Sequence, residues 1–280
     1  MARFSQLAVA AGLTAVESAS LDISREDPYR VGVVLGNGNG GFPTLEDNCR
    51  VLAERGGMRM TPFFFPMVLP NMAAANVSRY LGAHGYNATA TTACASSNQA
   101  IGQALDVIRR GAADVVLAGG TEAGISQLGL AGFAVMRALT THNEEPEKAC
   151  RPFDAERDGF VMGEGAGGLV LEELEHARGR TATIMAEFRG LGFTADAYHQ
   201  TDMPIGGEGG ARAMRLALKD AAIAPSDVGY VNAHGTSTPV GDMKELQAIR
   251  QVFNDKIPLI GSTKSLSGHA LGAAGVNESI

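Results

Sequence analysis

Strand-like and helix-like segments alternate along this chain, and this alternation limits the folds open to it more than any other feature. Short apolar runs such as residues 31–35 and 114–120 alternate with stretches that repeat apolar residues at helical spacing, such as residues 45–55. Strands that alternate with helices predict an α/β protein with buried, largely parallel sheets. The 36 glycines among 280 residues fit the many tight turns of such a fold.

The pattern places individual elements along the whole sequence. We expect helices at residues 4–18, 45–55, 72–81, 94–110, 173–178, 210–222 and 242–253. We expect strands at residues 31–35, 87–92, 114–120, 168–172, 184–187 and 257–260, and one directly before His234. Residues 61–70 are apolar but are broken by prolines, so this segment is predicted to be a loop.

Charge and composition exclude several classes of protein. The formal net charge of −7 makes nucleic acid an unfavourable partner. No run approaches the roughly 20 apolar residues that span a bilayer, and the first residues lack the pattern of a signal peptide. Cys49, Cys94 and Cys150 form no CxxC pair, which fits a reducing compartment without a structural disulfide or a metal site. We therefore expect a cytoplasmic protein that binds neither membrane nor metal.

One glycine-rich segment resembles a cofactor motif. Residues 36–41 satisfy G-x-G-x-x-G and follow a predicted strand, as in a dinucleotide-binding turn. The acidic residue that this motif requires at the end of a second strand is absent, because Glu54 falls inside a predicted helix. Pro43 also interrupts the entry into the helix. We predict a tight turn and no bound cofactor.

Cys94 is the first candidate catalytic residue. It lies among small residues, and a helical spacing of apolar residues follows at Ile101, Leu105 and Ile108. A thiol at the start of a helix meets free N–H groups and partial positive charge, which favour the thiolate. By itself such a cysteine is more often a small buried residue than a nucleophile.

Two later segments strengthen the case for a nucleophile. His234 ends a strand-like run and precedes a turn of Gly, Thr, Ser and Pro, and His269 closes the sequence from Ser262 to His269. Each histidine lies just beyond a predicted strand, where loops at a sheet edge collect functional groups. Either histidine taken singly is more often structural. A cysteine and two histidines at the ends of predicted elements together indicate a thiol-based active site.

These segments resemble the β-ketoacyl-acyl-carrier-protein synthases, the condensing enzymes with the thiolase fold. The resemblance rests on Thr91–Gly102, Arg151–Gly167, Tyr230–Asp242 and Ser262–His269, and it extends over the whole chain. It implies two related βα halves with buried sheets in a layered α-β-α-β-α arrangement. We place the N-terminal half at residues 1–180 and the C-terminal half at 181–280. Family members also have an opening strand and a glycine-rich closing segment, so the chain is similar to a synthase shortened at both ends.

The resemblance assigns roles to the candidate residues. It implies an acyltransferase in which Cys94 holds an acyl group while malonyl on acyl carrier protein loses CO2 and condenses with it in fatty acid elongation. His234 and His269 would stabilise the enolate oxygen, and a buried Lys264 would order the site with Glu278 as its acidic partner. Supporting or substrate-binding roles fall to Glu245, Asp242 and, for the pantetheine arm, Thr236 and Thr238. The implied partners are acyl carrier protein and a second copy of the chain.

Several alternatives stay open at this stage. A polyketide-type ketosynthase would use the same residues. A non-catalytic partner of the chain-length-factor kind would lack the cysteine, so Cys94 argues against it. An inactive fragment would keep the site residues without the complete fold. The sequence leaves open the type I or type II class and the acyl chain length.

Overall fold

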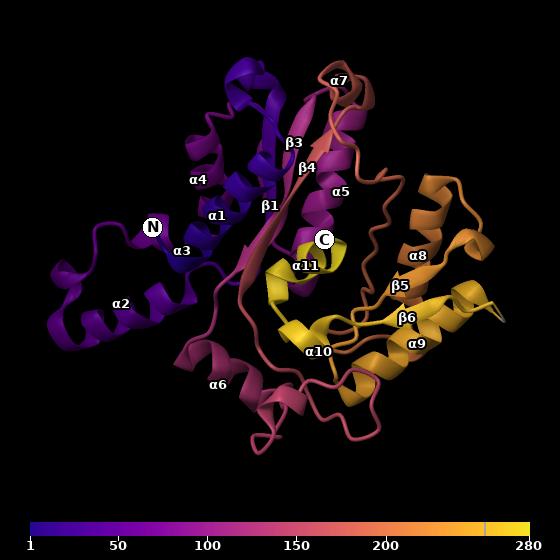
Figure 1. Cartoon of the computed structure of the whole chain (residues 1–280). Coiled ribbons are helices and arrows are strands. Elements are labelled where there is room, and N and C mark those ends of the chain that lie inside the picture. The colour runs from indigo at the N-terminus through magenta and orange to yellow at the C-terminus, as the bar shows by residue number, and fades with distance from the viewer. Residues whose placement is uncertain (255) are drawn as a thin grey trace. The chain divides into compact units, whose positions relative to one another are not determined.

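The computed structural model describes residues 1–254 and 256–280 and contains two compact units (Figure 1). The first unit is built from Met1–Gly132, Met162–Glu187 and Ala270–Ile280, and the second from Phe133–Val161 and Phe188–His269. Each unit therefore collects segments that are distant in sequence, whereas the predicted halves 1–180 and 181–280 are contiguous. That division of the sequence stays a prediction.

A four-stranded sheet forms the centre of the first unit, in the order β2-β1-β3-β4. The strands are β1 Val31–Gly36, β2 Asn87–Ala90, β3 Val115–Glu122 and β4 Gly165–Glu172. β1 pairs in parallel with both β2 and β3, and β4 runs antiparallel to β3. Every residue of β1 and β3 is buried, as expected for strands that are apolar throughout and covered on both faces.

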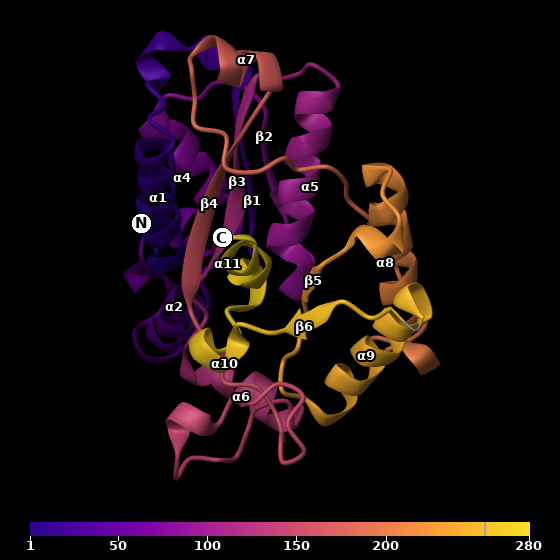
Figure 2. The same ribbon diagram turned by 45° about the vertical axis from the view of Figure 1, so that its right-hand side comes forward.

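Helices cover both faces of this sheet (Figures 1 and 2). On one face, α1 (Arg3–Ser18) packs against α4 (Met72–Leu81), and on the other α5 (Ser96–Arg109) packs against α11 (Ala274–Ser279). The core beneath α1 and α4 includes Phe4, Val33, Val77 and Leu117, all at most 2% exposed. The remaining helices that lie wholly in this unit are α2 Phe42–Arg55, α3 Phe64–Val68 and α7 Leu174–Gly179.

The second unit has a smaller core. Its two strands, β5 Tyr230–Asn232 and β6 Leu259–Gly261, pair in parallel with Val231 opposite Ile260. Helices α8 (Glu208–Ala221) and α9 (Pro239–Phe253) pack against each other around a cluster of buried residues, Ala211, Ala248, Ile249, Val252 and Phe253. The short helix α10 (Lys264–Ser267) follows β6, and both strands end at the loops that carry the predicted histidines.

Most predicted elements are confirmed, and two predictions are wrong. The predicted loop at 61–70 contains α3; Pro66 is tolerated there because it stands in the first turn, where its missing N–H has no partner in any case. The predicted strand at 184–187 does not form, although the structure describes all four residues. Ile184 and Met185 are 50% and 92% exposed, so no neighbouring strand covers them. Helix α6 (Gln127–Val135) was not predicted.

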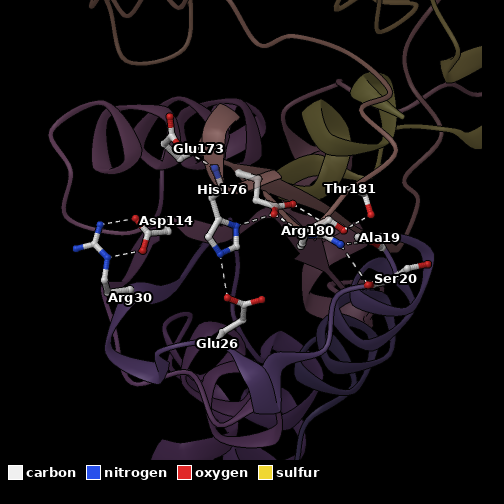
Figure 3. Close-up of polar contacts among 10 residues, drawn as sticks. Ala19, Ser20, Glu26, Arg30, Asp114, Glu173, His176, Arg180 and Thr181 are labelled. Atoms are coloured by element: carbon white, nitrogen blue, oxygen red, sulfur yellow. Dashed lines mark hydrogen bonds and ion pairs between the residues drawn. The ribbon is translucent and has the colours of Figure 1, made fainter. Parts of the chain in front are cut away.

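A polar cluster joins three segments of the first unit at one end of the sheet (Figure 3). The imidazole of His176 lies between two carboxylates, with Nδ1 2.8 Å from Glu172 Oε1 and Nε2 2.9 Å from Glu26 Oε2. Arg180 donates to the same Glu172 carboxylate, at 2.6 Å and 2.7 Å, and to the carbonyl oxygen of Ala19. Arg30 and Asp114 form a neighbouring ion pair. The cluster ties the loop after α1 to the junction of β4 and α7.

In the part of the chain that the structure describes, every helix is too short or too polar to span a lipid bilayer.

Candidate active site

Cys94 lies in the first unit, in a single 3-10 turn formed by Ala93–Ala95 between β2 and α5. The predicted helix at 94–110 thus begins at Ser96, directly after the cysteine. Ala93 has a φ of +50°, a left-handed conformation that makes the turn sharp. The hydroxyl of Ser96 accepts a hydrogen bond from the Thr92 N–H at 2.9 Å and donates one to the Ala93 carbonyl at 2.6 Å. The half-buried cysteine is therefore presented at the N-terminal end of α5 by a fixed turn.

Close backbone packing holds the start of α5 against the sheet. A Cβ atom on Gly120 would lie 2.6 Å from the Cβ of Ser97, and one on Gly36 would clash with the Ser96 backbone. The fully buried Ser97 hydroxyl accepts a hydrogen bond from the N–H of Val276 in α11 at 3.0 Å. Glycine at both positions thus allows the cysteine turn to approach the ends of β1 and β3.

The glycine-rich loop at 36–41 has its N–H groups occupied within the chain. The N–H groups of Gly38 and Asn39 donate to the carboxylate of Glu122, at 2.9 Å and 3.3 Å, and the N–H of Gly40 donates to the Asn37 side chain at 2.7 Å. A phosphate in a dinucleotide turn would need these same donors. The loop is therefore arranged as a closed turn. The absence of a cofactor stays a prediction.

His234 lies in the second unit, where its backbone is anchored by a carboxylate from α9. The N–H groups of His234 and Gly235 donate to the two oxygens of Glu245, at 2.6 Å and 2.8 Å. Burial raises the pKa of Glu245, and these two N–H groups oppose the shift. The carboxylate therefore fixes the loop immediately after β5.

Lys264 and His269 complete the histidine cluster. Both are 1% exposed, and the Lys264 ammonium donates a hydrogen bond to the carbonyl oxygen of His234 at 2.6 Å. The backbone N–H of His269 donates to the Val161 carbonyl at 2.8 Å. Its ring packs edge to face against two others, with centroids 5.1 Å from His234 and 5.2 Å from Phe160. The two imidazoles are held as neighbours by packing and by backbone hydrogen bonds.

The surroundings of both histidines favour the neutral imidazole. Burial, followed by the positive charges near it, lowers the pKa of His269 to about 2. Burial and the charge of Lys264 also lower the pKa of His234, although that residue keeps access to solvent. A neutral imidazole has one N–H that can donate a hydrogen bond and one nitrogen that can accept. The pair can therefore offer two N–H donors to one developing negative charge.

The predicted pantetheine-binding threonines lie in the turn before α9. Their hydroxyl oxygens, on Thr236 and Thr238, are 3.0 Å apart. Ser237 between them accepts a hydrogen bond from the N–H of Arg151 at 3.0 Å. The turn is therefore in contact with the segment that begins at Arg151.

An arginine and a buried aspartate fasten this segment to α9. Asp242, which is 1% exposed, accepts a hydrogen bond from the Phe153 N–H at 2.8 Å and pairs with Arg157 at 3.4 Å. Arg157 also donates to the carbonyl oxygens of Thr238 at 3.3 Å and Pro239 at 2.8 Å. The sequence alone assigns Arg157 no role, although this residue lies in the stretch Arg151–Gly167. One sequence by itself contains no pattern that distinguishes this ion-paired arginine from the arginines on the protein surface.

The structure gathers most, but not all, predicted site residues in one unit. Cys94 and Glu278 belong to the first unit, with Glu278 in α11, and the second unit contains the remaining seven, His234, His269, Lys264, Glu245, Asp242, Thr236 and Thr238. The pairing of Lys264 with Glu278 stays a prediction. Sequence reasoning missed Arg157 and also Glu122, whose hydrogen bonds to Gly38, Asn39 and Gly272 each span at least 83 residues.

Comparison with known families gives two matches that together cover nearly all of the chain. Residues 1–177 match "Beta-ketoacyl synthase, N-terminal domain" and residues 185–280 match "Beta-ketoacyl synthase, C-terminal domain". The 3-oxoacyl-[acyl-carrier-protein] synthase 2 of Staphylococcus aureus is 51% identical over 282 residues, covering 100% of this chain and 70% of that protein. The protein of the same name from Vibrio cholerae is 46% identical, covering 99% and 68%.

Solved structures of ketosynthases are also similar to this chain. A β-ketoacyl synthase from Burkholderia phymatum is 41% identical with a TM-score of 0.92, covering 100% of this chain and 68% of that one. A type II polyketide ketosynthase, solved with its acyl-carrier protein, is 37% identical with a TM-score of 0.92, covering 99% and 70%.

Proposed function

Because the chain belongs to the β-ketoacyl synthase family, we propose that Cys94, His234 and His269 carry out the family's condensation reaction. The predicted fold class, that of the thiolase-like ketosynthases, is confirmed by the structural likeness. The chain is an acyltransferase of the 3-oxoacyl-[acyl-carrier-protein] synthase type, which joins an acyl group to a malonyl unit with loss of CO2. The roles of individual residues are our proposal.

In the first step, the Cys94 thiolate attacks the thioester carbonyl of the acyl donor. The carbon–sulfur bond to the donor's pantetheine breaks, the pantetheine leaves as a thiolate, and the acyl group becomes a thioester of Cys94. The sharp turn before α5 supports this role, since it places the sulfur where helix N–H groups and dipole favour negative charge.

In the second step, the malonyl thioester loses CO2 and its carbonyl oxygen gains negative charge as an enolate. The neighbouring neutral rings of His234 and His269 would donate N–H groups to that oxygen, and loss of one such donor typically costs about 3 kcal/mol. The enolate carbon then attacks the Cys94 thioester, and the cysteine leaves as a thiolate. The observation that carries this proposal is the pair of neighbouring imidazoles, with the backbone of His234 held by Lys264 and Glu245 and that of His269 held by the Val161 carbonyl.

We also propose acyl carrier protein as the partner that delivers both groups. The proposal is supported by the solved ketosynthase that is complexed with its acyl-carrier protein. The hydroxyls of Thr236 and Thr238 would bind the amides of the phosphopantetheine arm, and we propose that no further cofactor is needed. A reducing compartment such as the cytoplasm would keep the Cys94 thiol available.

A homodimer is a further part of the proposal. Residues 58–65 of the first unit expose large apolar side chains, with Met58, Phe63 and Phe65 at 98%, 64% and 67%. A second copy of the chain would cover such side chains. Sedimentation of the purified protein at several concentrations tests this, and a monomer at all concentrations would contradict it.

The catalytic proposal is tested by acylation of Cys94. The purified chain is incubated with an acyl-carrier-protein thioester, and the adduct is located by intact and peptide mass spectrometry, with Cys94→Ala as the control. We expect one acyl group on Cys94 and none on the variant. No adduct, or equal labelling of Cys49 and Cys150, would favour the alternative of an inactive fragment. Release of CO2 from malonyl carrier protein, compared with His234→Ala, tests the second step.

A polyketide-type ketosynthase is the competing function. The curated relatives at 51% and 46% identity are fatty-acid-type synthases, whereas the polyketide ketosynthase is 37% identical. Fatty acid elongation is therefore the better supported pathway. Competition between saturated acyl and polyketo donors for Cys94 would distinguish the two.

A further inference from the structure

Glu122 is a fully buried carboxylate that the proposed chemistry does not use. It ends β3 and is 0% exposed. Its Oε2 accepts hydrogen bonds from the N–H groups of Gly38 at 2.9 Å and Gly272 at 3.1 Å, and its Oε1 accepts one from Asn39 at 3.3 Å. One side chain thus joins the loop after β1 to the turn Leu271–Ala273.

The surroundings of this carboxylate favour its ionised form geometrically. A carboxylate only accepts hydrogen bonds, and here both oxygens already face N–H donors. Burial nevertheless raises the pKa of Glu122 to about 7, with the backbone N–H groups of Gly272, Gly38, Asn39 and Ala123 opposing the shift. The side chain therefore occupies the N–H groups that an anion bound in the glycine-rich loop would need.

The turn that Glu122 holds is packed against the cysteine turn. Leu271–Ala273 contacts Ala93–Ala95, and both belong to the first unit. Little space separates the Leu271–Ala273 turn from the loop after β1. A Cβ atom on Gly38 would lie 2.7 Å from Glu122 Oε2, and one on Gly272 would clash with the N–H of Gly38. With so little side-chain material between them, the position of the cysteine turn depends on hydrogen bonds that keep its neighbours in place.

We propose that Glu122 is a positioning residue for Cys94, which fills the Gly36–Gly41 loop as an internal anion and holds the Leu271–Ala273 turn against the cysteine turn. The proposal rests on the proposed function only in taking Cys94 as the nucleophile. Its chemical consequence is that the Cys94 sulfur stays aligned with the N-terminal end of α5, where the thiolate is stabilised.

The test measures how fast iodoacetamide alkylates Cys94 at different pH values, with peptide mass spectrometry to identify the site. For Glu122→Gln we expect the rate near pH 7 to fall about tenfold, because the midpoint of the pH profile moves upward by about one unit. Partial unfolding would also speed the alkylation of Cys150, which is buried in the folded protein, and the same digests measure this. The matched control is Glu172→Gln, which removes another poorly exposed carboxylate of the same unit, away from Cys94, and should keep the wild-type midpoint.

A second pair of variants keeps the carboxylate in place. Gly38→Ala pushes a methyl group against Glu122 Oε2 and should reproduce the upward shift, whereas Gly57→Ala meets only Leu52 at 3.6 Å and should not. An unchanged midpoint in Glu122→Gln and Gly38→Ala would overturn the proposal. A downward shift of the midpoint in Glu122→Gln would also overturn the proposal, because it would mean that Glu122 acts on Cys94 only through its negative charge. If wild-type Cys94 reacts no faster than Cys49, the proposed function fails instead.

Discussion

The Lys264 ammonium lies 2.6 Å from the backbone carbonyl oxygen of His234 and donates a hydrogen bond to it. The lysine is 1% exposed, so its positive charge is held inside the second unit beside two imidazoles. This single contact fixes the backbone of one histidine and also helps to keep both rings neutral.

Replacing Lys264 with methionine should therefore raise the pKa values of His234 and His269 and slow malonyl decarboxylation. The loss of the charge removes one cause of the lowered pKa values, and the loss of the hydrogen bond frees the His234 loop. We expect decarboxylation to fall by at least about tenfold, which corresponds to about 1.4 kcal/mol. NMR titration of the imidazoles measures the pKa values. Lys244→Met, which removes another lysine of the same unit, is the control.

The neutral state of His269 predicts a particular pH dependence of stability. Its folded pKa of about 2 is below the ordinary 6.5, so as the pH falls below about 6.5 the unfolded chain binds a proton that the folded chain does not. The contribution of His269 to the unfolding free energy is present above that pH and is lost progressively in acid. Urea unfolding of the wild type and of His269→Gln should be measured between about pH 4.5 and about pH 8. The difference in unfolding free energy between the two proteins should become smaller as the pH falls. A constant difference would contradict the assignment.

The ion pair between Arg157 and Asp242 predicts a selective effect on substrate binding. Arg157→Met leaves a buried carboxylate without its cation, which costs about 3 kcal/mol of stability, and it releases the turn that carries Thr236 and Thr238. We expect KM for the acyl carrier protein to rise several-fold more than kcat falls. Adding Asp242→Asn should restore part of the stability, in a double-mutant cycle. Arg151→Met, an arginine from the same stretch, should change KM far less.

The contact between Ser97 and Val276 predicts how firmly α11 is attached. Ser97→Ala leaves the buried N–H of Val276 without its acceptor, which costs about 1–3 kcal/mol. Chemical denaturation followed by circular dichroism measures this change. Ser24→Ala, at an exposed serine of the same unit, should change stability by less than about 0.5 kcal/mol. Equal effects of the two variants would mean that the buried contact contributes nothing specific.

The polar cluster around His176 makes the first unit sensitive to alkaline pH (Figure 3). Partial burial lowers the pKa of His176, but the carboxylates of Glu172 and Glu26 outweigh it, and the net shift is upward. The stabilisation is therefore complete below about pH 6.5 and is lost as the pH rises through the folded pKa. We expect Glu26→Gln to reduce the unfolding free energy more at about pH 6 than at about pH 9. Parallel urea titrations at the two pH values give the answer.

The spacing of apolar residues predicted the strands that are buried on both faces and the helices that have a single apolar stripe. β1 and β3 are apolar throughout and are covered on both faces, and α4 and α5 show a clear apolar stripe, so their residue types match their environments. α6 was missed because its nine residues are apolar on nearly every side, which removes the periodic signal. Residues 184–187 have the composition of a strand but no partner, and a sequence does not show which edge a strand would meet.

The candidate site divides in the same way. Cys94, His234 and His269 could be singled out because each stands at the end of a recognisable element with turn residues beside it. Glu122 and Arg157 act through backbone groups that lie 81 or more residues away, so their roles depend on tertiary contacts. The glycine-rich loop shows most clearly that tertiary contacts cannot be predicted from one sequence. Its sequence permits an anion, and only the tertiary structure shows that its N–H groups donate to the side chain of Glu122.

The last eleven residues of the chain, Ala270–Ile280, belong to the same compact unit as the first helix. Helix α11 packs on β4 and α5 of that unit. Completing this face of the sheet requires contacts between residues that are far apart in the chain, such as the hydrogen bond between Ser97 and Val276. Contacts of such long sequence separation form slowly in folding, so we expect the covering of this face by α11 to be among the later events in the folding of the first unit.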